Sequence, residues 1–329
     1  MPTMPLLLFH VVLLAAVSLA ACSGELGHRR PHAHTHQNDP SLCHKSLPCG
    51  GHVDVHYPFF LANAALAVVD DGGDGHPARS YCGYPGMAVT CDGGCAILRL
   101  GGHNYTILDI SYENHTVVLV DRDLLINSGE CPRLTHNVTV PAPPKTSKSP
   151  LNLHTNQHLY CFSSLASNPA SVTAANNKDL SFFYDCVFTA DTAAPAQLPD
   201  IPPINCSSFP GGRGVSFVAR QSDMERQEQD AEWPRACRTV VVAPVLKDSL
   251  RSAEHHPQLN GDWYGQVLKR GFQLSWEPSA GPCYVCEQTK GKCSYNHSGV
   301  FVGCLRSDGS VRNSDCGKHG LYLEHAYFS

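Results

Sequence analysis

The chain has 329 residues, of which 16 are cysteine, and its formal net charge at pH 7 is −5. This balance gives no sign of the basic surface that nucleic acids require, so a nucleic-acid-binding protein is not expected. Sixteen cysteines are too many to remain free thiols in an oxidising compartment, and they predict a disulfide-rich protein.

Residues 1–22 have the pattern of a signal peptide. An apolar run at 6–16 is followed by small residues at a small-x-small cleavage site, although no basic residue precedes the run. The four residues 19–22, Leu-Ala-Ala-Cys, also spell a bacterial lipoprotein cleavage box. This run and the apolar stretch at 59–69 are both too short for a settled membrane span. We therefore expect a secreted protein without a transmembrane span.

Asparagine sequons of the Asn-x-Ser/Thr type support passage through the secretory pathway. They begin at Asn104, Asn114, Asn137, Asn205 and Asn296. Together with the signal peptide, they predict a secreted glycoprotein.

Residues 23–42 form a histidine-rich segment without an apolar anchor. Four histidines lie between His28 and His36, so a metal-binding arm is one interpretation. The interpretation that we favour is a disordered spacer before the first module.

Residues 43–140 are predicted to form a small antiparallel β module. The stretch VDVHYPFF alternates apolar and polar residues, and a Gly-Gly turn separates AILRL from NYTILDI. A further β-branched run follows in SYENHTVVLVDRDLL. Strands separated by glycine-rich turns are typical of small β domains. Four prolines at 141–150 then indicate an exposed linker.

Residues 151–309 are predicted to form a second module, followed by a tail at 310–329. Strands are expected at DLSFFYDCVF and RTVVVAPVL, and 222–237 is the best helical candidate because Ser222 and Glu225 could form a capping box. The length suits two domains. The predicted fold class is therefore mostly β, with two small disulfide-rich β modules joined by a Pro-rich linker.

Cys283 and Cys286 form a C-x-x-C motif whose meaning depends on the compartment. A zinc site needs thiolates, which the secretory pathway oxidises. A thiol–disulfide active site needs the motif at a helix N-terminus within a βαβ unit, and no helical periodicity follows Pro282. We therefore predict a structural disulfide corner, with the zinc and redox roles as the alternatives.

Nearly all cysteines between Cys43 and Cys316 are predicted to form disulfides. The cysteines in this range are Cys43, Cys49, Cys82, Cys91, Cys95, Cys131, Cys161, Cys186, Cys206, Cys237, Cys283, Cys286, Cys293, Cys304 and Cys316. The six cysteines from Cys43 to Cys131 are an even set that can close on itself.

Common catalytic motifs are missing from the sequence. It has no G-x-S-x-G, no H-E-x-x-H and no kinase motif, and the GGRG at 211–214 lacks the Lys-Ser/Thr of a phosphate loop. We therefore expect a protein that is not an enzyme and has no catalytic residue, bound metal or cofactor.

Several motifs nevertheless occur in a recognisable order. They are Cys49-Gly50-Gly51, HYPFF at 56–60, CGYPG at 82–86, VTC at 89–91, YTILDI at 105–110 and Cys131-Pro132. This order resembles the galacturonan-binding domain of plant wall-associated receptor kinases, especially their leaf-rust-resistance-like branch. Met87 stands where that family generally has Phe, and Cys95 is additional.

The second module resembles the C-terminal extracellular domain of the same family. Residues 179–186 are similar to its L-x-F-x-Y-N-C strand, with Asp185 in place of the Asn. GFQLSW at 271–276 and the four cysteines that follow match its ending. The family's receptors continue into a membrane span and a kinase, whereas this chain stops at Ser329. The resemblance therefore predicts a kinase-less relative.

The resemblance implies non-catalytic binding of pectic polysaccharide (polygalacturonan) in the plant cell wall. Between Cys43 and Val140, however, five basic residues face ten acidic ones. A polyuronate would therefore need clustered arginines or a calcium bridge between carboxylates. The candidate ligand-binding residues are Arg79, Arg99, Arg122 and Arg133.

Two other functions remain open. The first is a soluble decoy or co-receptor that binds a receptor ectodomain and no sugar. The more remote one is an extracellular thiol oxidoreductase that uses Cys283 and Cys286.

Overall fold

The structure is a computed structural model that describes residues 43–50, 53–62, 66–69, 78–126, 132–138, 163–164, 177–188, 201, 203–204, 214–220, 223–224, 233–254, 263–276, 282–296, 299–308 and 310–312. Several predictions concern residues outside these ranges. They are the signal peptide at 1–22, the spacer at 23–42, the linker at 141–150, the sequon at Asn205, and Cys131, Cys161, Cys206 and Cys316.

The described residues fall into two compact units. Unit 1 lies within Leu100–Ala142 and Phe162–Ser275, and unit 2 lies within Leu26–Arg99 and Trp276–Ser329. Each unit therefore combines residues from both modules predicted at 43–140 and 151–309. That division into modules stays a prediction.

Unit 1 contains a three-stranded antiparallel sheet in the order β12-β11-β13, formed by Val215–Arg220, Asn177–Cys186 and Cys237–Leu246. Residues of β13 alternate between core and surface, since Val241 and Val245 are buried while Val240 and Val242 are exposed. This period of two is the pattern of a sheet with one covered face.

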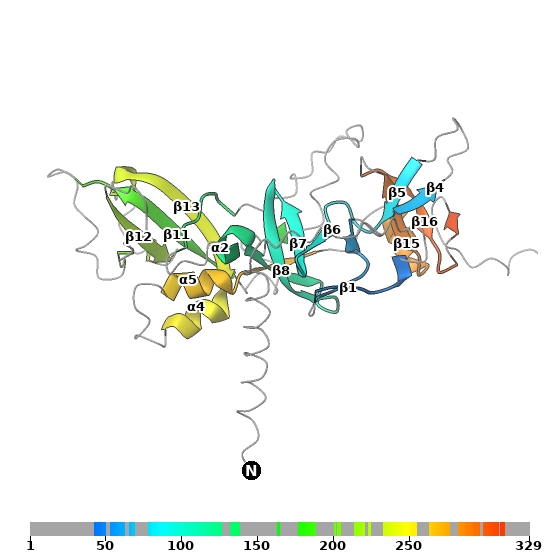
Figure 1. The fold of residues 1–329 in the computed structure, drawn as a ribbon, viewed down its shortest axis with the longest axis horizontal. Coiled ribbons are helices and arrows are strands. Elements are labelled where there is room, and N and C mark those ends of the chain that lie inside the picture. Colours follow the sequence, from blue (N-terminus) through cyan, green and yellow to red (C-terminus); the bar gives the residue numbers. More distant parts are fainter. Residues whose placement is uncertain are drawn as a thin grey trace, which may run out of the picture. The chain divides into compact units, whose positions relative to one another are not determined.

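Three short helices supply much of the apolar core against which this sheet packs (Figure 1). They are α2 (Arg122–Ile126), α4 (Lys247–Glu254) and α5 (Trp263–Lys269). Their apolar residues, among them Leu124, Leu250 and Val267, belong to one cluster with Phe182 and Tyr184 of β11.

A second group of strands in unit 1 has the order β10-β14-β9-β8. These strands are Ser163–Ser164, Phe272–Ser275, Thr116–Asp121 and His103–Ser111. Gly271, which precedes β14, has a φ of 77°, and a Cβ there would lie 2.1 Å from the carbonyl oxygen of Leu119. Only glycine therefore allows β14 to approach β9 so closely.

Unit 2 contains a five-stranded sheet in the order β17-β16-β15-β5-β4. The strands are Val311–Arg312, Phe301–Leu305, Lys292–Asn296, Ala78–Cys82 and Leu66–Val69. From the region predicted as the first module, β5 thus pairs directly with β15 near the C-terminus, and β4 pairs with β5. Val311 and Arg312, which the sequence predicts to lie in a tail, extend this sheet.

The remaining elements of unit 2 are short. β1 (Leu47–Cys49) pairs with β2 (Val53–Val55). β3 (Phe60–Leu61) runs parallel to β6 (Ala88–Asp92), which pairs with β7 (Cys95–Leu100). Phe59, beside β3, is buried edge-to-face against Trp276.

The structure differs from the sequence analysis at two helices. The C-x-x-C lies on α6 (Pro282–Gln288), where no helix is predicted from the sequence. Pro282 takes the first helical position, which proline favours because its missing N–H has no intrahelical partner there. The helix predicted through residue 237 is also wrong at its end, since Trp233–Ala236 is a 3-10 turn and Cys237 begins β13.

The predicted fold class is confirmed: the described chain is mostly strands, arranged in small β-rich units with several disulfides. Among the described helices, none has the length and apolar character needed to cross a bilayer.

Candidate functional site

The two cysteines of the C-x-x-C motif are bonded to partners outside it. Cys283 pairs with Cys293, and Cys286 pairs with Cys304. Glu287 lies close enough to the sulfurs of Cys283 and Cys293 to suggest a metal cluster. The disulfide, however, leaves neither sulfur as a thiolate, which a zinc ion would require. In the described structure this region is a disulfide corner.

Glu287 instead joins two tyrosines from the motifs that carry the family resemblance. Its Oε1 accepts hydrogen bonds from the Tyr57 hydroxyl at 2.5 Å and from the Tyr84 hydroxyl at 2.6 Å. Burial raises the pKa of Tyr57 well above its ordinary value, and the nearby Glu287 carboxylate raises it further. The Tyr57 hydroxyl therefore stays protonated, and both tyrosine hydroxyls donate to Glu287. These hydrogen bonds connect Tyr57 and Tyr84 with Glu287 inside unit 2.

Beside this network, Cys43 and Cys82 are buried thiols. Burial raises the pKa of the Cys82 thiol well above its ordinary value, and a hydrogen bond to Cys43 adds to the effect. The ammonium of Lys292 donates to the Cys43 carbonyl at 2.8 Å. The two sulfurs thus lie side by side without a disulfide in the structure, and their predicted oxidation stays a prediction.

Five other described cysteines belong to the disulfide framework. Cys49 is bonded to Cys91, and Cys186 to Cys237. Cys95 also takes part in a disulfide.

Four of the predicted sequons can be located in the described structure. Asn104, Asn114 and Asn137 are exposed, and Asn296 is half-buried. Their glycosylation stays a prediction.

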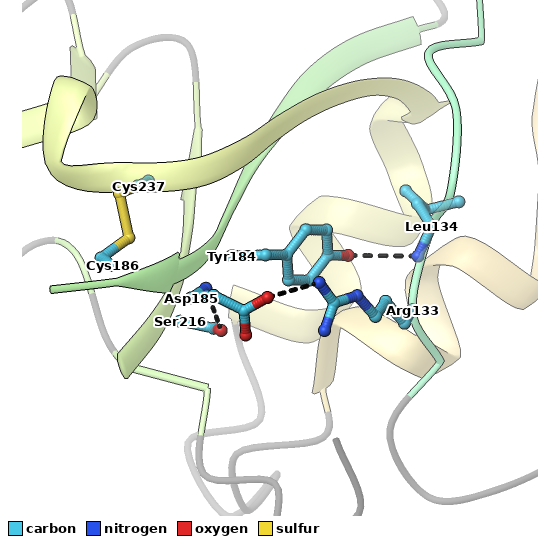
Figure 2. A network of polar contacts seen from close by, with 7 residues as sticks. All are labelled: Arg133, Leu134, Tyr184, Asp185, Cys186, Ser216 and Cys237. Atoms are coloured by element: carbon cyan, nitrogen blue, oxygen red, sulfur yellow. Dashed lines mark hydrogen bonds and ion pairs between the residues drawn. A yellow bond between two sulfur atoms is a disulfide. The ribbon is translucent and has the colours of Figure 1, made fainter. Parts of the chain in front are cut away.

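Arg133, one of the four candidate ligand-binding arginines, is occupied by contacts within unit 1 (Figure 2). Its guanidinium lies 2.8 Å from the Asp185 carboxylate and over the Tyr184 ring, 4.6 Å from the centroid. The Tyr184 hydroxyl in turn accepts a hydrogen bond from the Leu134 amide at 3.1 Å. Figure 2 shows these groups converging next to the Cys186–Cys237 disulfide.

The backbone conformation and contacts of residue 185 explain why Asp can replace the Asn of the family pattern. It has a φ of 55°, in the left-handed region that Asn and Asp tolerate better than most residues. Its amide donates to the Ser216 hydroxyl at 3.2 Å. Aspartate therefore keeps the backbone conformation and adds a charge that pairs with Arg133.

The other three arginines are divided between the units. Arg99 is exposed at the end of β7 in unit 2, and it forms no ion pair with a described residue. Arg79 is in β5 of the same unit, and its side chain lies outside the described part of the structure. Arg122 begins α2 in unit 1 and is half-buried. The structure does not bring any two of the four arginines together into a described cluster.

A group of two histidines, an aspartate and a tyrosine lies in unit 1 and is not evident from the sequence. The rings of His103 and His136 stack with centroids 3.5 Å apart, and Nε2 of His136 lies 3.4 Å from the buried Asp121 carboxylate. Burial raises the pKa of Asp121, while a hydrogen bond from the Asp123 amide and the nearby His136 oppose the shift. The Tyr105 hydroxyl lies 3.4 Å from the same nitrogen.

An open pocket of about 290 Å³ lies between α4 and α5 in unit 1. Its lining residues are Ser249, Ser252, Ala253, Trp263, Gln266, Val267 and Arg270. None of these residues is predicted as a site from the sequence, because the pocket forms only when two short helices pack together. The local signal in the sequence is the spacing of Trp263 and Arg270, which are seven positions apart and therefore lie on one side of a helix.

Two family models match the chain. The model for the wall-associated receptor kinase galacturonan-binding domain matches residues 43–121, and the model for the wall-associated receptor kinase C-terminal domain matches residues 205–309. The network of Tyr57, Tyr84 and Glu287 therefore connects residues from both matched regions.

Two curated relatives come from Arabidopsis thaliana. Leaf rust 10 disease-resistance locus receptor-like protein kinase-like 1.2 is 25% identical over 275 residues, which cover 82% of this chain and 33% of that protein. The relative numbered 2.1 is 24% identical over 281 residues, which cover 85% of this chain and 36% of that protein. The chain therefore spans about a third of the length of these relatives.

No solved structure matches the chain. The two family models and the receptor-like kinases agree with the resemblance that the motifs indicate. The chain carries the galacturonan-binding and C-terminal domains of the wall-associated receptor kinase family.

Proposed function

We propose that this protein binds pectic polysaccharide in the plant cell wall, outside the cell, and that it does so without catalysis. The observation that supports this most is the match of residues 43–121 to the galacturonan-binding domain. In the described part of that region, the exposed Arg99 is the best-placed cation, because its guanidinium has no carboxylate partner there. Arginine is suited to a uronate since it can bind a carboxylate through two hydrogen bonds.

Charge sets a condition on this function. The acidic excess of residues 43–140 means that affinity has to come from local contacts, which act within a Debye length of about 8 Å in physiological salt. Calcium could reinforce binding by bridging carboxylates of the protein and the polymer. Weak, salt-sensitive binding is therefore expected.

The experiment compares binding of a de-esterified oligogalacturonide to wild type and to an Arg99→Gln, Arg122→Gln double variant, over a salt series with and without calcium. Arg238→Gln is the matched control, since Arg238 is an exposed arginine of β13 outside the first module predicted at 43–140. We expect the double variant to lose affinity and the control to keep it. Equal affinity of wild type, the double variant and the control would show that Arg99 and Arg122 do not contribute to binding.

The alternative is a soluble decoy or co-receptor that pairs with a receptor ectodomain. The names of the two relatives favour this alternative, because both are receptor-like protein kinases. Capture of a receptor ectodomain together with no binding to oligogalacturonide would make it the better account.

A further inference from the structure

The pocket between α4 and α5 is formed by one face of each helix. On α5 and the residue after it, Trp263, Gln266, Val267 and Arg270 follow the spacing i, i+3, i+4 and i+7. On α4, the lining residues are 249, 252 and 253, which follow the same spacing. Residues at these intervals lie on one side of a helix, so the sequence directs all seven side chains toward the space between the helices.

The lining divides into an apolar floor and a polar rim. Val267 is buried, and Trp263 is half-buried and packs against the core cluster. Gln266 and Arg270 are exposed at the rim. An apolar body with a few convergent polar groups is the usual composition of a small-ligand pocket. The volume of about 290 Å³ is just below the roughly 300–1,000 Å³ typical of such pockets, which suits a small ligand such as one or two sugar units.

The polar groups of the rim are open to a ligand. The guanidinium of Arg270 forms no ion pair with a described residue, whereas nearby Arg251 lies 3.8 Å from the Asp248 carboxylate. The Ser252 hydroxyl donates to the Asp248 carbonyl at 2.8 Å, which leaves its oxygen able to accept a hydrogen bond. The segment WYGQVLKR contains two cations and no acid, in a chain whose net charge is −5.

From these features we infer that the pocket between α4 and α5 is a second carbohydrate site, which takes a hexuronate unit. The indole of Trp263 offers an apolar surface for the sugar ring, Arg270 pairs with the carboxylate, and Gln266 and Ser252 bind hydroxyl groups. This inference rests on the proposed function, but it places a contact within the matched C-terminal domain, outside residues 43–121.

The test titrates the whole protein with galacturonic acid and with digalacturonate, and uses galactose as the uncharged probe. Tryptophan fluorescence is the readout, and the signal is assigned by Trp263→Phe. The key variant is Arg270→Gln, with Arg238→Gln as a control that removes an exposed arginine of the same unit. Circular dichroism and thermal unfolding establish that each variant is folded.

We expect a saturable fluorescence change with both acidic probes, at least tenfold weaker binding in Arg270→Gln, and wild-type binding in Arg238→Gln. Galactose should bind at least tenfold more weakly than galacturonic acid. Equal binding by Arg270→Gln and wild type, or equal binding of galactose and galacturonic acid, would overturn the inference.

A long oligogalacturonide separates this inference from the proposed function. If wild type binds it and Arg270→Gln binds it equally well, the pocket is not a uronate site but the proposed function stands. If wild type does not bind the polymer but binds digalacturonate, and Arg270→Gln loses this binding, the inference about the pocket is supported and the proposed polymer binding is wrong. If neither the acidic sugars nor the polymer bind, both fail.

Discussion

The hydroxyl of Tyr57 donates a 2.5 Å hydrogen bond to the carboxylate of Glu287, 230 residues further along the chain. The same oxygen of Glu287 accepts a second bond from Tyr84. Because hydrogen bonds to a charged acceptor each stabilise a protein by about 1.5–3 kcal/mol, this carboxylate should be important for the stability of unit 2.

We predict that Glu287→Ala lowers the free energy of unfolding by about 2–4 kcal/mol, because both tyrosine hydroxyls lose their acceptor. Tyr84→Phe should cost less, about 1–2 kcal/mol, since it removes one bond and leaves Tyr57 in place. Tyr284→Phe is the control, because Tyr284 is an exposed tyrosine on the same helix. Denaturant unfolding with intact disulfides measures all three. A Glu287→Ala protein as stable as the control would contradict this role.

A second prediction concerns the adjacent thiols of Cys43 and Cys82. With oxidised glutathione as the oxidant, these two cysteines should join in a disulfide while one glutathione disulfide is reduced to two thiols. Closing a 39-residue interval should stabilise the protein by about 3–4 kcal/mol on the chain-entropy account. Differential alkylation followed by mass spectrometry measures the state of each cysteine.

The Cys82→Ser variant is the control. In this variant Cys43 has lost its predicted partner, so it should react with the alkylating reagent once the protein is unfolded. The prediction is wrong if Cys43 and Cys82 of wild type still react with the alkylating reagent as free thiols after oxidation and unfolding.

A third prediction assigns Arg133 to folding. Its side chain is 31% exposed and its partner Asp185 is 13% exposed, so solvent screens the ion pair only in part. Arg133→Gln should lower the free energy of unfolding by about 1–2 kcal/mol through loss of this pair and of the contact with the Tyr184 ring. Arg238→Gln should change it by less than about 0.5 kcal/mol. Thermal unfolding compares the two, and equal stability would show that the Arg133 contacts contribute nothing.

A fourth prediction concerns the pH dependence of unit 2. Burial lowers the pKa values of His44 and His56 below the ordinary 6.5, with Lys292 adding to the shift in both. The unfolded chain therefore takes up protons at a higher pH than the folded one. Stability should be complete above pH 6.5 and fall as the pH drops from 6.5 through the folded pKa values.

A His44→Gln, His56→Gln variant should lose less stability between pH 7 and pH 5 than wild type does. Unfolding by denaturant at a series of pH values measures this difference. A variant whose stability falls as steeply as that of wild type would exclude these two histidines as the cause.

The sequence predicts the strands of this protein better than its helices, for a physical reason. β7, β8, β11 and β13 coincide with runs rich in β-branched and aromatic residues, whose preference for strands is local. By contrast α4, α5 and α6 each span about two turns, too few for a helical period to stand out.

The contacts between distant segments could not be predicted from spacing. Tyr57 and Glu287 are far apart in sequence, and nothing local in either segment points to the other. The pocket of Trp263 and Arg270 needs the packing of two helices. The disulfide corner at Cys283, by contrast, followed from the expected oxidising compartment, which acts on every cysteine irrespective of the fold.

The most direct test of the central claim is calorimetric titration of the purified protein with a de-esterified oligogalacturonide and with its fully methyl-esterified counterpart. Each is measured at low and physiological salt, with calcium and with a chelator. Pectin binding predicts a measurable affinity for the de-esterified chain that weakens as salt increases, and little affinity for the esterified chain. No detectable binding of the de-esterified chain in any buffer would contradict the claim.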